Sequence, residues 1–321
     1  MIGRMVVAGL VMLASAGPLA APSPGPGGGS GGGPQATGSQ EGENNEKVSV
    51  TLKDSRIVVS GNGTGGKSDG YRVKRPCWYE PGGNAEEMLK KQEGSKPEWI
   101  PETEWRRHLD DLKQFKDKVG KEGTWWTRAY NAADPNALSC LAGLEPYVFV
   151  PPNTTPPAGI TVRELADIAR AALTVPKPKI EVNPDVKSYV NLDTWVWLGD
   201  IGPTTRSVTA TLPGVMSATV TATLGRLEIK SGTTKERADV RQDCAGGGKP
   251  YGKGKKDDEF SCGVTYRRAS ADQPRGVYTM TVTAVWPVTA PGVDFDYAPV
   301  QMSADRDVVV GEVQSVVKGG E

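Results

Sequence analysis

The sequence predicts an α+β protein in which a small mixed α/β N-terminal domain precedes an antiparallel β-sandwich. Helix-period apolar patterns occur before residue 186, Val/Thr-rich alternating runs dominate after it, and glycine and proline separate those runs. The part of the chain after the N-terminal spacer is long enough for two domains with cores of their own. We therefore expect a mixed α/β domain at residues 47–185 and a β-sandwich domain at residues 186–319.

The N-terminus has the pattern of a secretory signal peptide at residues 1–21. Arg4 supplies a positive charge, Met5–Leu13 is almost wholly apolar, and small residues suitable for cleavage follow. This apolar run is shorter than the roughly 20 residues that span a bilayer. Residues 22–46 are rich in glycine, proline and serine, which predicts a disordered linker. We expect a secreted, extracellular protein, with cell-wall association and an uncleaved leader as open alternatives.

Four cysteines behind such a leader indicate disulfides rather than metal ligation or a catalytic thiol. Pairing Cys77 with Cys140 and Cys244 with Cys262 keeps each loop within one composition block, so we expect this arrangement among the three that are possible. A zinc site would need closely spaced cysteines or histidines, and the chain has one histidine, His108. The sequence predicts no metal site and no cofactor.

The first block is expected to contain strands and two helices. Lys47–Leu52 and Arg56–Ser60 are predicted to form a pair of strands joined at residues 53–55. Glu102–Val119 has helical periodicity, and a capping box that begins at Thr161 opens the second helix, which prolines stop. The apolar stripe of the first helix comprises Trp105, Leu109, Leu112, Phe115 and Val119.

The second block consists of Val/Thr-rich runs at short intervals with Gly/Pro turns between them, which is typical of an antiparallel sandwich. The disulfide between its two cysteines would tie a Gly/Lys-rich connection at Ala245–Phe260 to the sheet. The expected strands are Ser207–Leu212, Met216–Leu224, Val277–Val288, Pro299–Ser303 and Val308–Val317.

Several short segments resemble known proteins. Cys77–Tyr79 (C-W-Y), the proline-rich Thr174–Pro178, Val190–Trp197 and Val310–Gln314 resemble segments of a group of exported actinobacterial proteins of unknown function. Ser261–Trp286 looks like the closing half of a PKD-like β-sandwich domain. The resemblance implies an Ig/PKD-like sandwich at the C-terminus and brings no known activity with it.

The sequence gives no active-site signature, so we assign no catalytic residue. A nucleophile activated by histidine would depend on His108, and no nucleophile elbow or phosphate-binding loop is present. Glycoside hydrolysis needs only two carboxylates, so a carboxylate-dependent cell-wall glycan hydrolase is the alternative function. Asp294 and Asp296 are too few to define a calcium site. The candidate acids are Glu102, Glu104, Asp110, Asp111, Asp193 and Asp200.

Tryptophan is the most informative residue type for binding, because eight tryptophans outnumber four phenylalanines. Adjacent tryptophans at 125 and 126 must point to opposite faces of an extended segment, which leaves exposure of one of them as the alternative to burial, the default expectation for these side chains. The candidate binding residues are Trp78, Trp125, Trp126, Trp195 and Trp197.

These observations favour a secreted, non-catalytic binding or structural protein of the cell envelope. Its expected partner is a cell-wall glycan or an envelope protein. A net charge of zero argues against a nucleic-acid partner, and no membrane span is expected in the mature chain.

Overall fold

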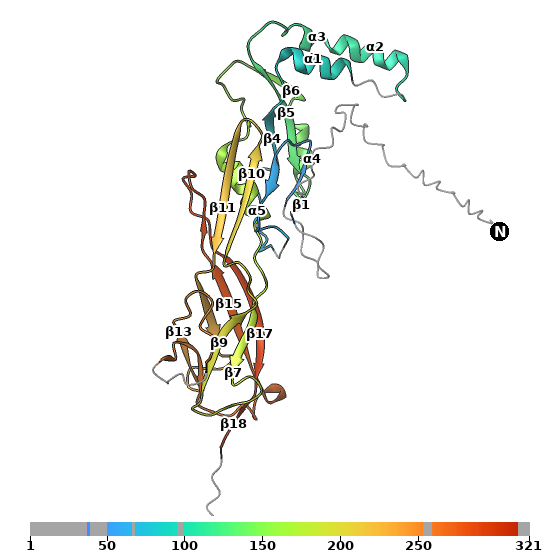
Figure 1. Cartoon of the computed structure of the whole chain (residues 1–321). Coiled ribbons are helices and arrows are strands. Elements are labelled where there is room, and N and C mark those ends of the chain that lie inside the picture. Colours follow the sequence, from blue (N-terminus) through green and yellow to red (C-terminus); the bar gives the residue numbers. More distant parts are fainter. Residues whose placement is uncertain (1–36, 39–49, 66–67, 95–98, 253–258, 314–321) are drawn as a thin grey trace, which may run out of the picture. The chain divides into compact units, whose positions relative to one another are not determined.

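The computed structural model describes residues 37–38, 50–65, 68–94, 99–252 and 259–313. Most of this part consists of antiparallel sheets, with few helices (Figure 1). The expectation of a β-rich fold with some helices is therefore confirmed. The expected leader at residues 1–21 and nearly all of the expected linker at residues 22–46 lie outside the described residues.

The first sheet gathers five strands from the N-terminal half of the chain. Its order is β1-β2-β5-β4, and β6 also pairs with β5. β5 is the central strand because it is long enough for β6 to pair with its first half and β2 with its end. The strands are β1 (Thr37–Gly38), β2 (Val50–Lys53), β4 (Cys77–Pro81), β5 (Thr124–Asn131) and β6 (Tyr147–Val150).

Helices α1 (Ala85–Glu93), α2 (Glu102–Asp111), α3 (Lys113–Lys116) and α4 (Ala137–Ala142) accompany this sheet. The single helix expected over residues 102–119 is wrong in its length, because the chain divides at Leu112 into α2 and α3. Leu112 and Phe115 enter a buried cluster with Trp125. Leu109 and Val119, expected in the same stripe, are 36% and 44% exposed.

The expected strands near residues 50 and 60 both exist, but they do not pair with each other. β2 pairs with β5, whereas β3 (Val58–Ser60) pairs with β10 (Thr205–Leu212) in another sheet. Asp54 takes a left-handed conformation, with φ 54°, directly after β2. The connection therefore leads from one sheet into the next rather than closing a hairpin.

A second sheet rests on α5 (Val162–Ala172). Its order is β16-β11-β10-β3, with β11 at Met216–Thr223 and β16 at Val288–Thr289. The capping box of α5 forms as expected: the Thr161 side chain accepts a hydrogen bond from the Glu164 N–H, and the Glu164 carboxylate accepts from the Thr161 N–H. Every residue of α5 from Leu165 on is buried, because the helix packs against both β10 and β11.

The remaining strands form two antiparallel sheets whose buried residues belong to one core. One sheet has the order β12-β15-β17 and the other β13-β14-β9-β7, and a short parallel pair joins β8 to β18. The bounds are β7 (Lys179–Asn183), β8 (Ser188–Tyr189), β9 (Asp193–Gly199), β12 (Arg226–Lys230), β13 (Ala238–Gln242), β14 (Cys262–Tyr266), β15 (Tyr278–Trp286), β17 (Val300–Val308) and β18 (Val310–Gly311).

Strand pairing crosses the expected boundary at residue 186 in two places. β3 and β7 precede the boundary, yet they pair with β10 and β9, which follow it. The hairpin of β10 and β11 packs on α5, and among the later C-terminal strands β16 joins the same sheet. The two-domain division stays a prediction, and the hydrogen-bonded sheets do not follow it.

The expected disulfide pairing is confirmed. Cys77 in β4 is bonded to Cys140 in α4 with their Cα atoms 5.8 Å apart, and Cys244 is bonded to Cys262 in β14 with a Cα separation of 4.9 Å. The first bond fastens a helix to the N-terminal sheet. The second holds the chain that follows β13 to the neighbouring strand.

Candidate functional site

The most regular exposed feature is a set of hydroxyl side chains on the face of β10 and β11 that points away from α5. Residues alternate along both strands, so that valine, alanine and leucine face the helix and serine and threonine face outward. Ser60 of β3 and Thr289 of β16 extend the set on the two sides. We call it the hydroxyl face: Ser60, Thr205, Ser207, Thr209, Thr211, Ser217, Thr219, Thr221, Thr223 and Thr289.

Cross-strand hydrogen bonds order these hydroxyls into rows. The Oγ atoms of Ser207 and Thr221 lie 2.9 Å apart, and the Oγ1 atoms of Thr209 and Thr219 lie 2.8 Å apart. Each hydroxyl has one hydrogen to donate and two lone pairs to accept, so a hydroxyl bonded to one neighbour keeps capacity for a ligand. The rows therefore offer donors and acceptors at the spacing of paired strands.

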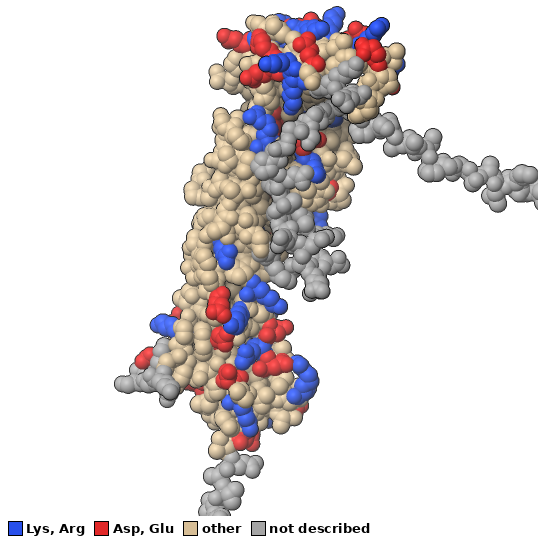
Figure 2. All heavy atoms as spheres, turned by 45° about the vertical axis from the view of Figure 1, so that its right-hand side comes forward, with Lys and Arg blue, Asp and Glu red and all other residues tan. Residues whose placement is uncertain are grey.

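The hydroxyl face carries no ionisable side chain. Arg206 is on β10 but has the opposite parity, and its Nη1 donates to the Asn62 carbonyl at 2.9 Å. Figure 2 shows an almost uncharged area at the height at which Figure 1 places the β10–β11 hairpin. Such a surface suits a neutral, hydrogen-bonding partner rather than a polyanion.

Beneath the hairpin, a polar cluster fixes α5 to two loops. The Oδ1 atom of buried Asp167 accepts hydrogen bonds from the hydroxyls of Tyr71 at 2.9 Å and Tyr297 at 2.8 Å. Arg170, one helical turn further on, makes a two-point ion pair with Asp69. Burial and the neighbouring Asp167 raise the pKa of both tyrosines far above the usual range. The cluster keeps the support of the hydroxyl face in one position.

A second buried carboxylate lies in the N-terminal sheet. Glu80 of β4 is fully buried and accepts from the Ser55 hydroxyl at 2.7 Å, the Arg56 N–H at 2.6 Å and the Trp78 indole at 2.8 Å. Burial raises the pKa of Glu80, and these three donors oppose that shift. Because its hydrogen-bond donors enclose the Glu80 carboxylate, we assign this acid a structural role.

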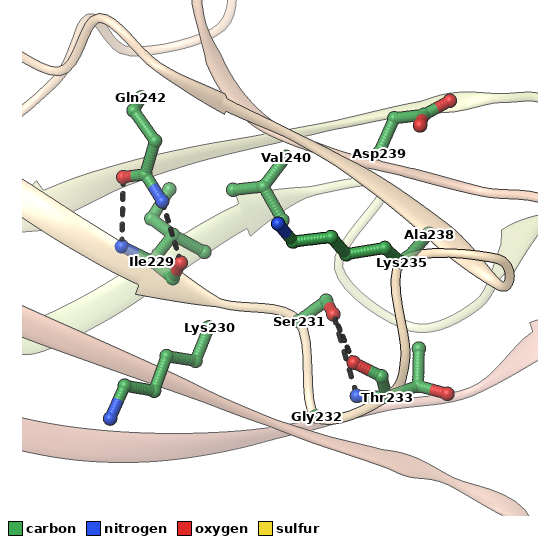
Figure 3. Close-up of a pocket in the computed structure, with 10 residues that line it drawn as sticks. All are labelled: Ile229, Lys230, Ser231, Gly232, Thr233, Lys235, Ala238, Asp239, Val240 and Gln242. Atoms are coloured by element: carbon green, nitrogen blue, oxygen red, sulfur yellow. Dashed lines mark hydrogen bonds between the residues drawn. The ribbon is translucent and has the colours of Figure 1, made fainter.

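Two of the hollows on the described surface lie among residues of the C-terminal half. The first, of about 680 Å³, lies between the ends of β12 and β13 (Figure 3). Within it, the Gln242 amide accepts from the Ile229 N–H at 3.1 Å and donates to the Ile229 carbonyl at 2.7 Å (Figure 3). The side chain thus takes the place of a neighbouring strand on β12. Lys230 and Lys235 are the cations that line this hollow.

The second hollow, of about 720 Å³, includes Arg237 and Asp272. Arg237 contacts both carboxylate oxygens of Asp272, at 2.8 and 2.6 Å, and also binds the Tyr278 hydroxyl. Hydrogen bonds from Arg237 lower the pKa of Asp272 to about 2. Asp272 is therefore ionised at neutral pH and occupied by arginine, which leaves it unsuited to general acid catalysis.

Four of the five candidate tryptophans are buried: Trp78, Trp125, Trp126 and Trp195. The expectation that Trp125 and Trp126 point to opposite faces is confirmed, since they lie in different core clusters. Both are buried, which agrees with the default expectation, because helices cover one face of β5 and the segment around Val150 covers the other. Trp197 is half-buried on β9.

An exposed tryptophan, Trp99, lies outside the candidate set. Trp99 is 75% exposed, beside buried Ile100. Its surroundings in the sequence gave no periodic signal that separates it from the buried tryptophans. The five candidates stay a prediction as binding residues, but four of them present no open ring to a ligand.

The candidate acids are dispersed. Glu102, Glu104 and Asp110 are exposed on α2, whereas Asp193 accepts from the Thr265 hydroxyl at 2.5 Å and Asp200 pairs with Lys179 at 2.7 Å. His108 and Asp111 lie on α2, and the acids Asp294 and Asp296 are exposed after β16. Among the described residues, no group of three or more His, Cys, Asp and Glu side chains could hold a metal ion.

Comparisons with protein-family models, with curated proteins and with solved structures gave no match. Within the described part of the chain, no helix has both the length and the apolar character to cross a membrane. The hydroxyl face was accessible to sequence reasoning through the Thr/Ser alternation of residues 205–223. That alternation predicts strands, and the direction in which the hydroxyls point depends on where α5 packs.

Proposed function

We propose that this protein is a secreted, non-catalytic binding or structural component of the cell envelope, and that the hydroxyl face is its contact surface for a neutral glycan. The observation that carries the proposal is the ordered array of exposed and half-buried, uncharged hydroxyls on strands backed by a buried helix. Glycans present many hydroxyls of their own, which donate and accept in the same way.

The construction of the site supports recognition rather than turnover. Strands held by cross-strand pairing and by α5 keep the donors and acceptors in fixed positions, so little ordering entropy is lost on binding. The resemblance to exported proteins with a PKD-like sandwich agrees with such a role. Two disulfides are compatible with an extracellular location.

The test is retention of the full chain on isolated cell wall and on purified neutral polysaccharide. The Thr209→Val/Thr219→Val double variant removes two hydroxyls without changing the side-chain shape. With about 1 kcal/mol for each hydrogen bond, we expect about 30-fold weaker retention. The matched control is Thr283→Val/Ser303→Ala, which removes the hydroxyl pair that joins β15 to β17 at 2.8 Å.

Equal retention of the wild type, the valine variant and the control would show that the hydroxyl face is not the contact surface. If the wild-type chain is retained neither on cell wall nor on the neutral polysaccharide, glycan binding is refuted. Release of soluble reducing ends during the incubation would instead support the carboxylate-dependent hydrolase.

A further inference from the structure

The free edge of β11 carries unpaired backbone groups. β16 pairs only with Thr221 and Ala222, near the end of β11. Thr223 donates its N–H to the Pro287 carbonyl at 3.1 Å on that same side. Backbone direction alternates along a strand, so Ser217 and Thr219 also turn their N–H and C=O groups away from β10. Among the described residues, none bonds to these four groups.

Two other sheet edges in the described part of the chain are covered by side chains. The Gln242 amide occupies both backbone groups of Ile229 on β12 (Figure 3). Arg306 donates to the Ile180 carbonyl of β7 at 3.4 Å. The β11 edge, Met216–Val220, has no charge, no proline and an unbroken register with β10. A strand edge that lacks charged side chains, proline and covering side chains can pair with another strand.

We propose that a second copy of this chain pairs with this edge, β11 against β11 in antiparallel orientation, about a two-fold axis at Ala218. In this register Ser217 of each copy lies opposite Thr219 of the other. Both residues direct their backbone groups outward, so the two pairs exchange four N–H···O=C bonds. The contact is self-complementary, as a two-fold interface requires.

The chemistry of the edge favours a second copy over a charged partner. The edge and the adjoining hydroxyl face contain no ionisable side chain, and the whole chain has zero net charge. Two copies therefore approach without electrostatic repulsion, whereas a charged segment would gain no ion pair. In the proposed register serine faces threonine and alanine faces alanine, so no bulky or charged side chain is opposed by its like.

Pairing would also continue the hydroxyl rows from one copy into the next. The row that contains Thr209 and Thr219 would meet Ser217 of the second copy, which stands beside its own Thr211. The hydroxyl face would then extend over four central strands. This inference does not depend on glycan binding, since the pairing uses backbone groups.

Sedimentation equilibrium of the full chain over a wide concentration range tests the proposal. We expect a monomer–dimer equilibrium. Thr219→Pro removes an N–H that bonds to no described residue, and Thr219→Lys places like charges near the axis. Each is expected to weaken dimerisation at least tenfold with unchanged circular dichroism. The matched control, Thr283→Lys, introduces the same charge on β15, which is paired on both sides.

The register has a test of its own. Ala218→Cys places two thiols opposite each other at a non-hydrogen-bonded position, where Cα atoms are about 4.5 Å apart, close enough for a disulfide. We expect a disulfide-linked dimer after mild oxidation, and none for Thr209→Cys on the central strand. A monomer at every concentration would overturn the proposal. A dimer that Thr219→Lys leaves intact, or that Ala218→Cys does not cross-link, would overturn it equally.

Discussion

Replacing Asp167 by alanine is expected to be among the most destabilising single changes outside the apolar core. Its side chain is 4% exposed, and Oδ1 accepts from Tyr71 at 2.9 Å and from Tyr297 at 2.8 Å. A hydrogen bond to a charged group contributes about 1.5–3 kcal/mol, so losing two predicts a loss of about 3–6 kcal/mol in the free energy of unfolding. That is a large part of the about 5–15 kcal/mol of a typical domain.

The assay is urea unfolding followed by tryptophan fluorescence, with the slope of the transition checked for constancy. Tyr71→Phe and Tyr297→Phe each remove one donor together with its own bond, so each is expected to cost about 1–2 kcal/mol. Asp294→Ala, an exposed acid near Tyr297, is the control and should change stability by less than about 0.5 kcal/mol. If Asp167→Ala cost no more than either phenylalanine variant, the carboxylate would not be the common acceptor.

Three further outcomes are expected. Because the folded state raises the pKa of Tyr71 and Tyr297, their contribution to stability is complete below the ordinary tyrosine pKa of about 10 and is lost as pH rises above it, so the urea midpoint should fall from about pH 10 upward and fall less in Tyr71→Phe. The disulfides close separations of 63 and 18 residues, so replacing both cysteines of the first by serine should cost about 4 kcal/mol against about 3 kcal/mol for the second, measured by thermal unfolding. Gly232, at φ +80°, has no room for a Cβ beside the Thr279 carbonyl, so Gly232→Ala should lose about 1–3 kcal/mol in the same measurement, and an unchanged melting temperature would contradict this.

Features set by neighbouring residues could be predicted from the sequence. The capping box of α5 involves residues three apart, so the start of this helix was correctly placed. The disulfide pairing followed from composition blocks, and the opposite directions of Trp125 and Trp126 followed from strand alternation. Each of these inferences needs only local geometry.

Features that join distant segments could not be predicted in this way. β3 and β10 pair across about 150 residues, and nothing in the sequence of either strand indicates which strand it pairs with. Asp167 is hydrogen-bonded to tyrosines 96 and 130 positions away, so the residues next to it in the sequence do not indicate that it is buried. The burial of both Trp125 and Trp126 depends on cover supplied to each face of β5 by other segments. Single-sequence patterns give the direction of a side chain but not what covers it.

Thr219 belongs both to the hydroxyl face and to the β11 edge, and this overlap separates the two proposals experimentally. Thr209→Val/Thr219→Val removes hydroxyls but leaves every backbone N–H in place, so it should weaken glycan retention and leave dimerisation unchanged. Thr219→Lys acts at the edge and should reduce dimerisation. Thr219→Lys also removes one hydroxyl of the hydroxyl face. Its glycan retention should fall by more than the loss of that hydroxyl explains only if the dimer presents two hydroxyl faces to one polymer, since linked sites bind with a raised effective concentration.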